Sequence, residues 1–194
     1  MVKYTGMRNG ISLVEMMIAI ILFGVVSIIG YKYYTNFMNT SLSGQKARVA
    51  AVIDQARQLS NAYDVYKAQF GDSPTTINDL NASNAMILTE IPPGIEGIAG
   101  TTNVVWELAT NLNIDGTVGD IAFTYPINTS TTADDLQYCN IFNNLADSDW
   151  ELNAAAVPDA LATAYSGGFT TFFCWDNIGD GSGTTQVVFI KELN

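Results

Sequence analysis

The chain begins with a long apolar run, continues with apolar residues at helical spacing, and ends in short apolar runs separated by polar residues. The first run covers residues 11–31 and carries no charge from Met16 to Tyr31. As a helix, these residues would be roughly 30 Å long, about the thickness of the hydrocarbon core of a bilayer. The pattern therefore predicts a membrane-spanning helix.

After this run, apolar residues recur in steps of three and four, as on one face of a helix. The stripe consists of Val49, Val52, Ala56, Leu59, Tyr63, Tyr66 and Phe70. No proline occurs before Pro74, so the helix can continue to Gly71, which is a candidate C-cap, and Pro74 prevents it from going further. The two segments predict one helix over residues 12–70. A coiled-coil seam is the alternative, but the short register and its two tyrosines favour packing on a sheet.

Beyond Pro74, glycine, asparagine, threonine and aspartate separate short apolar runs that are typical of strands. Strands are predicted over residues 104–108, 121–125, 171–175 and 187–190. Short helices are predicted over residues 78–88 and over residues 134–145, the latter starting near Thr132 or Ala133. A long N-terminal helix packed on an antiparallel sheet is an α+β fold.

The residues around the apolar run separate three explanations for it. Lys3 and Arg8 precede it without any acid, so the positive-inside rule places the N-terminus in the cytoplasm. A secretory signal peptide would end in small residues at its cleavage site, and residues 28–34 offer none. A plain signal anchor explains the run but not Glu15, because a carboxylate within a bilayer is costly and marks a function.

The segment Gly10 followed by ISLVEMMI resembles the class III leader junction of type IV pilins and pseudopilins. The resemblance implies that a membrane prepilin peptidase cleaves between Gly10 and Ile11, and that the new Ile11 amine is N-methylated. Glu15 then becomes the fifth residue of the mature chain, where the family keeps a glutamate. Gly24 falls where the family commonly has a small residue. The motif is specific because a basic leader, a glycine, an apolar run and one acid coincide.

Two features depart from the family pattern. The mature chain would begin with Ile11, whereas the family usually begins with Phe or Met. No proline kinks the helix near the end of the apolar run, where Lys32 stands, and Gly30 is the nearby helix-weakening residue. This difference leaves local melting of the helix in a filament open.

The resemblance implies three parts of the chain. Residues 1–10 are the leader peptide, residues 11–71 are the N-terminal helix, and residues 72–194 are a globular α+β head. Within the helix, residues 11–31 form the membrane span and later the filament core, and residues 32–71 form the amphipathic half.

Two cysteines, Cys139 and Cys174, lie in the predicted head. An even pair in an exported domain is most simply a disulfide, and this pair has no CxxC spacing of the kind that binds zinc. In the family, such a bond attaches the C-terminal region to the sheet. The stretch DLQYC that ends at Cys139 is similar to the type IVb subgroup, whereas the short leader is more like type IVa, so the subgroup stays open.

The charge and composition argue against several classes of function. The chain has 8 basic and 19 acidic residues, and from Asp72 onward it has 16 acids and a single base, Lys191. Such a surface repels phosphate, so we expect no nucleic acid on the head. The chain has no histidine, which removes the commonest general base and metal ligand. With no nucleophile–base pair, phosphate loop or carboxylate dyad, we expect neither an enzyme nor a cofactor.

One loop contains several oxygen ligands. Asp176 and Asp180 lie in the sequence DNIGDG, which follows a predicted strand and is a weak candidate for calcium. It lacks the spacing and the closing glutamate of an EF-hand loop, so a hairpin loop is the favoured interpretation and no metal is expected.

Together with the resemblance, these features predict a structural subunit that assembles with copies of itself into a helical filament. The other expected partners are the prepilin peptidase and the pilus assembly machinery of the inner membrane. We expect the precursor in the inner membrane and the mature protein in an extracellular filament. Acidic heads of neighbours are expected to meet the bases of the helix: Lys32, Lys46, Arg48, Arg57 and Lys67.

Two other functions remain open at this point. One is a minor pilin or a type II secretion pseudopilin, which acts as a binding or secretion-machine component rather than as the bulk polymer. The other is an anchored ectodomain that never polymerises and keeps its N-terminal Met1 or Val2.

Overall fold

The computed structural model divides the chain into two compact units, residues 1–44 and residues 45–194. The residues that it describes are 13–82, 85–98, 106–129, 131–152, 154, 156–158, 160–161, 165, 168–169, 171–176 and 185–193, without the side chains of residues 13, 15, 33–40 and 176.

Helix α1 runs from Leu13 to Phe70 and confirms the long predicted helix. It ends at the expected residue. Gly71 has φ +80°, and its N–H donates to the Lys67 carbonyl at 2.9 Å. Glycine adopts this left-handed conformation without strain, so it closes the last turn and turns the chain away from the helix.

In the second unit, α1 buries most of the predicted apolar stripe. Its buried members are Val49, Val52, Ala56, Leu59 and Tyr63. The Tyr63 ring meets Phe123 of the sheet edge to face, with 6.2 Å between ring centres. The stripe therefore packs on a sheet and not in a coiled coil. Its last member was predicted wrongly: Phe70 is 40% exposed, because its ring packs on Tyr66 one turn earlier instead of entering the core.

Four strands form one antiparallel sheet in the order β1-β2-β4-β3. Their bounds are Glu107–Asn113 for β1, Val118–Ile127 for β2, Phe172–Asp176 for β3 and Thr185–Glu192 for β4. All four overlap the predicted strands, and with the helices they give the predicted α+β fold. Strand β1 extends well past its predicted end, because pairing with β2 holds polar residues that have low strand propensity. Residues 104 and 105 of that prediction lie outside the described part of the chain.

The two short helices met different outcomes. Helix α2, from Thr132 to Ala146, confirms the second prediction, and the Thr131 hydroxyl caps it by accepting from the Asp134 N–H at 3.1 Å. The first prediction, a helix that follows Thr76, was wrong in its type and length. A 3-10 turn, η1, from Ile77 to Leu80, does begin after Thr76, but the described residues from 81 to 88 are not helical. Met86 has φ +48°, a left-handed conformation that a right-handed helix does not accommodate.

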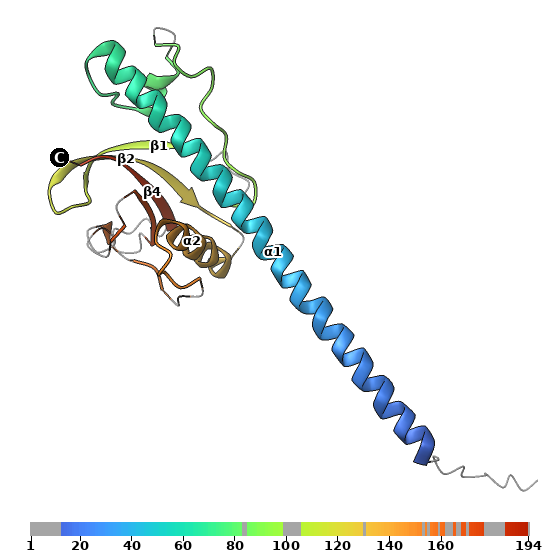
Figure 1. Cartoon of the computed structure of the whole chain (residues 1–194). Helices are drawn as coiled ribbons and strands as arrows, with labels where there is room; N and C mark the ends of the chain where they lie inside the picture. Colours follow the sequence, from blue (N-terminus) through green and yellow to red (C-terminus); the bar gives the residue numbers. More distant parts are fainter. Residues whose placement is uncertain are drawn as a thin grey trace, which may run out of the picture. The chain divides into compact units, whose positions relative to one another are not determined.

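The strands divide their side chains between two faces of the sheet. One face is covered by α1 and α2 (Figure 1) and presents Phe123, Tyr125 and Phe189. The other face carries a second apolar cluster made by Ile114, Ala122, Phe169, Phe173 and Val188. The chain between α2 and β3 supplies Phe169 and the partly buried Trp150 to this second cluster. The head is therefore built on both sides of the sheet.

Candidate functional site

The N-terminal unit presents apolar side chains around the whole circumference of α1. Every described side chain between residues 14 and 32 is exposed. The large apolar ones are 49% to 76% exposed: Val14, Met16, Met17, Ile18, Ile20, Ile21, Leu22, Phe23, Val25, Val26, Ile28, Ile29 and Tyr31. A helix that is apolar on every side requires a covering from a membrane or from other proteins. This segment is the candidate site of the first unit.

The polar and small residues of this segment fit such a covering. The Ser27 hydroxyl donates to the Phe23 carbonyl at 2.8 Å, so it needs no partner outside its own helix. A Cβ added at Gly24 or Gly30 would meet nothing within 4 Å. Glycine inside a helix costs about 1 kcal/mol relative to alanine, and no contact within the chain requires it at these two positions. Small residues of this kind allow another helix to approach closely.

The residues predicted for processing lie at the edge of what the structure describes. Gly10 and Ile11 are outside the described residues, and Glu15 belongs to α1 without a described side chain. In the portions of the chain that are described, no helix is long and apolar enough to cross a membrane. Cleavage after Gly10, methylation of Ile11 and the role of Glu15 therefore stay predictions.

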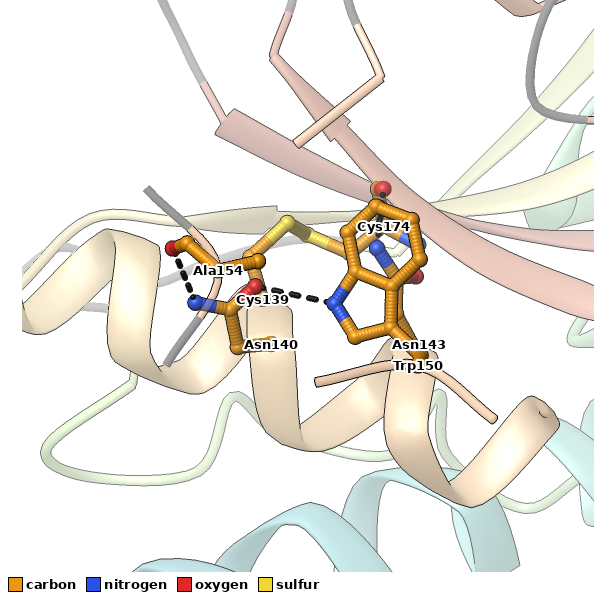
Figure 2. The surroundings of a disulfide bond; sticks show 6 residues. All are labelled: Cys139, Asn140, Asn143, Trp150, Ala154 and Cys174. Atoms are coloured by element: carbon orange, nitrogen blue, oxygen red, sulfur yellow. Dashed lines mark hydrogen bonds between the residues drawn. A yellow bond between two sulfur atoms is a disulfide. The ribbon is translucent and has the colours of Figure 1, made fainter. Parts of the chain in front are cut away.

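The second unit contains the expected disulfide. Cys139 of α2 is bonded to Cys174 of β3, their Cα atoms are 5.1 Å apart, and both residues are fully buried (Figure 2). The bond closes a loop with a sequence separation of 35 residues. It attaches α2 to an edge strand of the sheet, because β3 pairs only with β4 among the described strands.

A buried asparagine beside the disulfide was missed by the sequence analysis. The Asn143 side chain accepts from the Cys174 N–H at 2.6 Å and donates to the Cys174 carbonyl at 3.0 Å. Asn143 thus takes the place of a neighbouring strand at this point of the sheet edge. Without it, the buried N–H and carbonyl of Cys174 would be unpaired. Asn143 follows Cys139 by one helical turn, so both project from the same side of α2. That spacing is the signal that the sequence offered.

A second asparagine of α2 holds the chain that follows the helix. The Asn140 side chain donates to the Ala154 carbonyl at 2.9 Å and accepts from the Trp150 indole N–H at 3.0 Å (Figure 2). The Trp150 ring packs on Phe169, with 5.6 Å between centres. The disulfide, Asn143 and Asn140 together fix α2, β3 and the chain between them.

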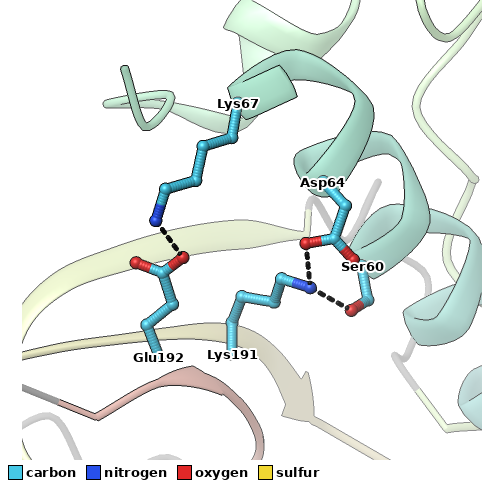
Figure 3. A network of polar contacts seen from close by, with 5 residues as sticks. All are labelled: Ser60, Asp64, Lys67, Lys191 and Glu192. Carbon is cyan, nitrogen blue, oxygen red and sulfur yellow. Dashed lines mark hydrogen bonds and ion pairs between the residues drawn. The ribbon is translucent and has the colours of Figure 1, made fainter. Parts of the chain in front are cut away.

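Charged residues at the end of β4 bind the last turns of α1 in the same unit (Figure 3). We call Ser60, Asp64, Lys67, Lys191 and Glu192 the C-terminal clasp. The Lys191 ammonium donates to Asp64 at 2.7 Å and to Ser60 at 2.9 Å, and its side chain is only 12% exposed. The Lys67 ammonium, on a more exposed lysine side chain, donates to Glu192 at 2.7 Å, and the glutamate raises the pKa of Lys67.

An irregularity in the sheet allows both residues of β4 to take part in the clasp. Consecutive strand residues normally point to opposite faces. Here Ala122 pairs with Ile190, and Ile121 pairs with Glu192, so the register skips Lys191. Such a bulge redirects side chains, and Lys191 and Glu192 both reach α1. In the sequence, Lys191 stands out as the single base after Asp72, but the pattern does not predict which residues it contacts.

The bases of α1 are less available to neighbouring copies than the sequence suggested. Lys67 pairs with Glu192, and Arg57 lies 3.2 Å from Asp54. The Arg48 guanidinium donates to the Tyr138 hydroxyl of α2 at 2.9 Å. The expectation that acidic heads of other copies meet these bases therefore has to account for partners within the chain.

The weak calcium candidate gains no support. Asp176 is the last residue of β3 and its side chain is not described, and Asp180 is outside the described residues. The residues that are described contain no group of three histidine, cysteine or acidic side chains placed to hold a metal.

Comparison with known proteins adds one finding. Residues 6–31 match the family model described as the prokaryotic N-terminal methylation motif, which is the class III signal peptide of type IV pilins. No curated protein and no solved structure matches the chain. The match covers the predicted leader junction and the apolar segment of α1, and it points to a structural protein rather than to an enzyme.

Proposed function

We propose that the protein is a structural subunit of a type IV pilus-like surface filament, processed by a prepilin peptidase and assembled through its N-terminal helix. One observation carries the proposal: the methylation motif at residues 6–31 leads into a helix whose described apolar side chains are exposed on all sides. The precursor is held in the inner membrane by residues 11–31, and the head of residues 72–194 forms the outer part of the filament.

The energetics explain why this helix needs both a membrane and a filament. Burying one large apolar side chain stabilises by about 1.5–3 kcal/mol relative to water, so the exposed segment would not remain uncovered. Transfer from lipid to a helical filament core brings no such gain, because lipid tails are equally apolar. Close helix packing at Gly24 and Gly30, together with ion pairing by Glu15, is the source of stabilisation that remains.

Glu15 pairs with the methylated amine of Ile11 on a neighbouring subunit in this proposal. An isolated carboxylate in apolar surroundings is expensive unless a cation meets it. Once the leader is removed, the nearest base in the same chain is Lys32, 17 residues later and roughly 25 Å along a helix. The neighbour's amine neutralises Glu15 and sets the vertical offset between subunits.

The N-terminus of the native protein tests the proposal. Mass spectrometry of filaments sheared from the cell surface should find a chain that begins at N-methylated Ile11. Filaments whose subunits still carry residues 1–10 would contradict it, and so would an intact N-terminus on a protein that never leaves the membrane.

Abundance separates the major subunit from the alternatives that share the motif. A major pilin dominates the sheared-fibre preparation. A minor pilin or secretion pseudopilin is processed in the same way but is a trace component of it, and an anchored ectodomain is absent from it.

A further inference from the structure

A groove opens between α1 and the helix-covered face of the sheet. It has a volume of about 270 Å³ and lies entirely within the second unit. Its wall from α1 includes Ile53, Ala56 and Arg57, and its floor includes Phe123, Phe172 and Phe189. The groove is therefore apolar inside, with one guanidinium at its rim.

The groove is open because α2 covers only part of β3. Asn143 and Cys139 fasten α2 at Cys174, and Phe172 lies two residues earlier on the same face of the strand. Phe172 is half-buried, although its ring packs on Phe189 with 5.4 Å between centres. Thr171, beside it, is exposed. Among the described residues, α1 and the sheet line this end of the aromatic face, and no residue of α2 does.

The charges around the groove favour an acidic partner. From Asp72 onward the chain carries 16 acids and one base, Lys191, and that base is already enclosed by Asp64 and Ser60. The side chain of Arg57 is 74% exposed, and that of its neighbour Asp54 is 67% exposed. A pair this exposed is weak and exchanges partners readily. Arg57 is thus available to a carboxylate that arrives together with an apolar side chain.

We propose that this groove is the docking site for the acidic head of a second copy of the chain, which inserts an apolar side chain between α1 and Phe172 and places a carboxylate on Arg57. The inference rests on the proposed function, in which copies pack side by side. The described part of the head includes pairings of an exposed apolar residue with an acid close by in the sequence, such as Leu145 with Asp147 and Val118 with Asp115. Self-assembly of the chain would not by itself predict which residues of two copies meet in this groove.

Site-specific photocrosslinking in assembled filaments tests the proposal. The full chain, expressed in its own host, carries p-benzoylphenylalanine in place of Phe172, and a second version carries it at the exposed Thr171 in case the first disturbs the core. After irradiation, we expect a product of twice the subunit mass, and its cross-linked peptide should come from residues 72–194 of another copy.

Charge variants on the same background test the role of Arg57. Arg57→Glu should lower the yield of the cross-link about fivefold, which is the effect of losing an exposed ion pair. Arg57→Lys should retain most of it. Gln69→Glu adds an acid at another exposed position of α1, about three turns from Arg57, and should leave the yield unchanged.

The outcomes distinguish this inference from the proposed function. Cross-links to a different protein, or none at either position in filaments that contain methylated Ile11, would overturn the groove contact and leave the filament function intact. An equal loss in Arg57→Glu and Gln69→Glu would overturn the assigned role of Arg57. A chain with an uncleaved leader and no filaments would overturn both proposals.

Discussion

At the scale of single residues, the head depends on polar side chains that replace missing backbone partners. Asn143 pairs with both backbone groups of Cys174 at the edge of the sheet. The Asp79 carboxylate accepts from the backbone N–H groups of Thr75 and Thr76 at 2.9 Å and 2.8 Å, and so holds the turn after α1. Such contacts are individually modest, but loss of those from Asn143 leaves a buried donor and a buried acceptor unpaired.

Asn143→Ala should destabilise the head by about 2–4 kcal/mol, because it leaves the buried N–H and carbonyl of Cys174 without partners. Thermal and denaturant unfolding of the detergent-solubilised chain would measure this, with the disulfide intact. Asn61→Ala changes an exposed asparagine on α1 and should stay within about 0.5 kcal/mol of the original protein. Equal stability of the two variants would refute the role given to Asn143.

Asp79 should make the protein sensitive to acid. Its backbone hydrogen bond from Thr76, with further bonds from Thr75, holds the pKa of the carboxyl below its usual value. A pKa lowered by folding adds stability that is complete above the unfolded pKa and disappears as pH falls through the folded one. Between about pH 5 and pH 2, the unfolding free energy should therefore fall more steeply in the original protein than in Asp79→Asn.

The matched control for this titration is Asp72→Asn, which removes an exposed carboxylate from the same connection after α1. Its profile should keep the steep fall of the original protein. Parallel acid profiles for the original protein and Asp79→Asn would show that Asp79 does not contribute.

At the scale of elements, the end of β4 is attached to α1 by two ion pairs whose lysines differ in exposure. Lys191 is nearly enclosed and contacts a carboxylate, a hydroxyl and the face of the Tyr63 ring, 5.3 Å from its centre. The side chains of Lys67 and Glu192 are 46% and 33% exposed. Exposed pairs contribute little, whereas a partly buried charged hydrogen bond contributes more.

Lys191→Met should therefore lower the unfolding free energy by about 1–2 kcal/mol, and Lys67→Met by less than about 1 kcal/mol. Because Asp64 is 62% exposed and Lys67 and Glu192 are also partly in solvent, added salt should weaken both ion pairs, while the contacts of Lys191 with Ser60 and the Tyr63 ring remain. The measurement is the unfolding of both variants at low and high salt. Equal losses would show that burial does not distinguish the two pairs.

At the scale of the whole molecule, the two units correspond to the two parts of the proposed filament subunit. The first exposes an apolar helix, and the second is a closed α+β structure fixed by a disulfide and the C-terminal clasp. The helix therefore supplies the proposed assembly contact of the core, and the head supplies the proposed outer surface.

Glu15→Val should insert into the membrane as well as the original protein and still fail to assemble. It leaves the Ile11 amine of a neighbour without a counter-ion in apolar surroundings, which costs about 3–5 kcal/mol. Filament yield should fall at least about tenfold, while Glu15→Asp, which keeps the charge but has a shorter reach, should assemble partially. The measurement is the amount of the protein in sheared fibres relative to its amount in the membrane. Normal fibre yields for Glu15→Val would refute the pairing of Glu15 with the Ile11 amine of a neighbour.

The sequence by itself determined the features that local pattern encodes. The apolar segment, the helix end at Gly71 and the approximate strands follow from composition and period within short windows, whereas the leader junction at Gly10 comes from the family resemblance and stays a prediction. The disulfide was predictable because the chain has only two cysteines, which leaves one possible intramolecular pair. Where local signals conflicted, as around Met86, the predicted helix was wrong.

The tertiary structure alone decided which polar residues meet. The Lys67–Glu192 contact joins residues 125 positions apart, and the bond from Asn143 reaches 31 positions along the chain. Asparagines, aspartates and lysines have no period that identifies a distant partner, because one hydrogen-bonding group fits many others. The groove beside Arg57 arises in the same way: it depends on where α2 stops covering β3, which the packing of three elements determines and no local window contains.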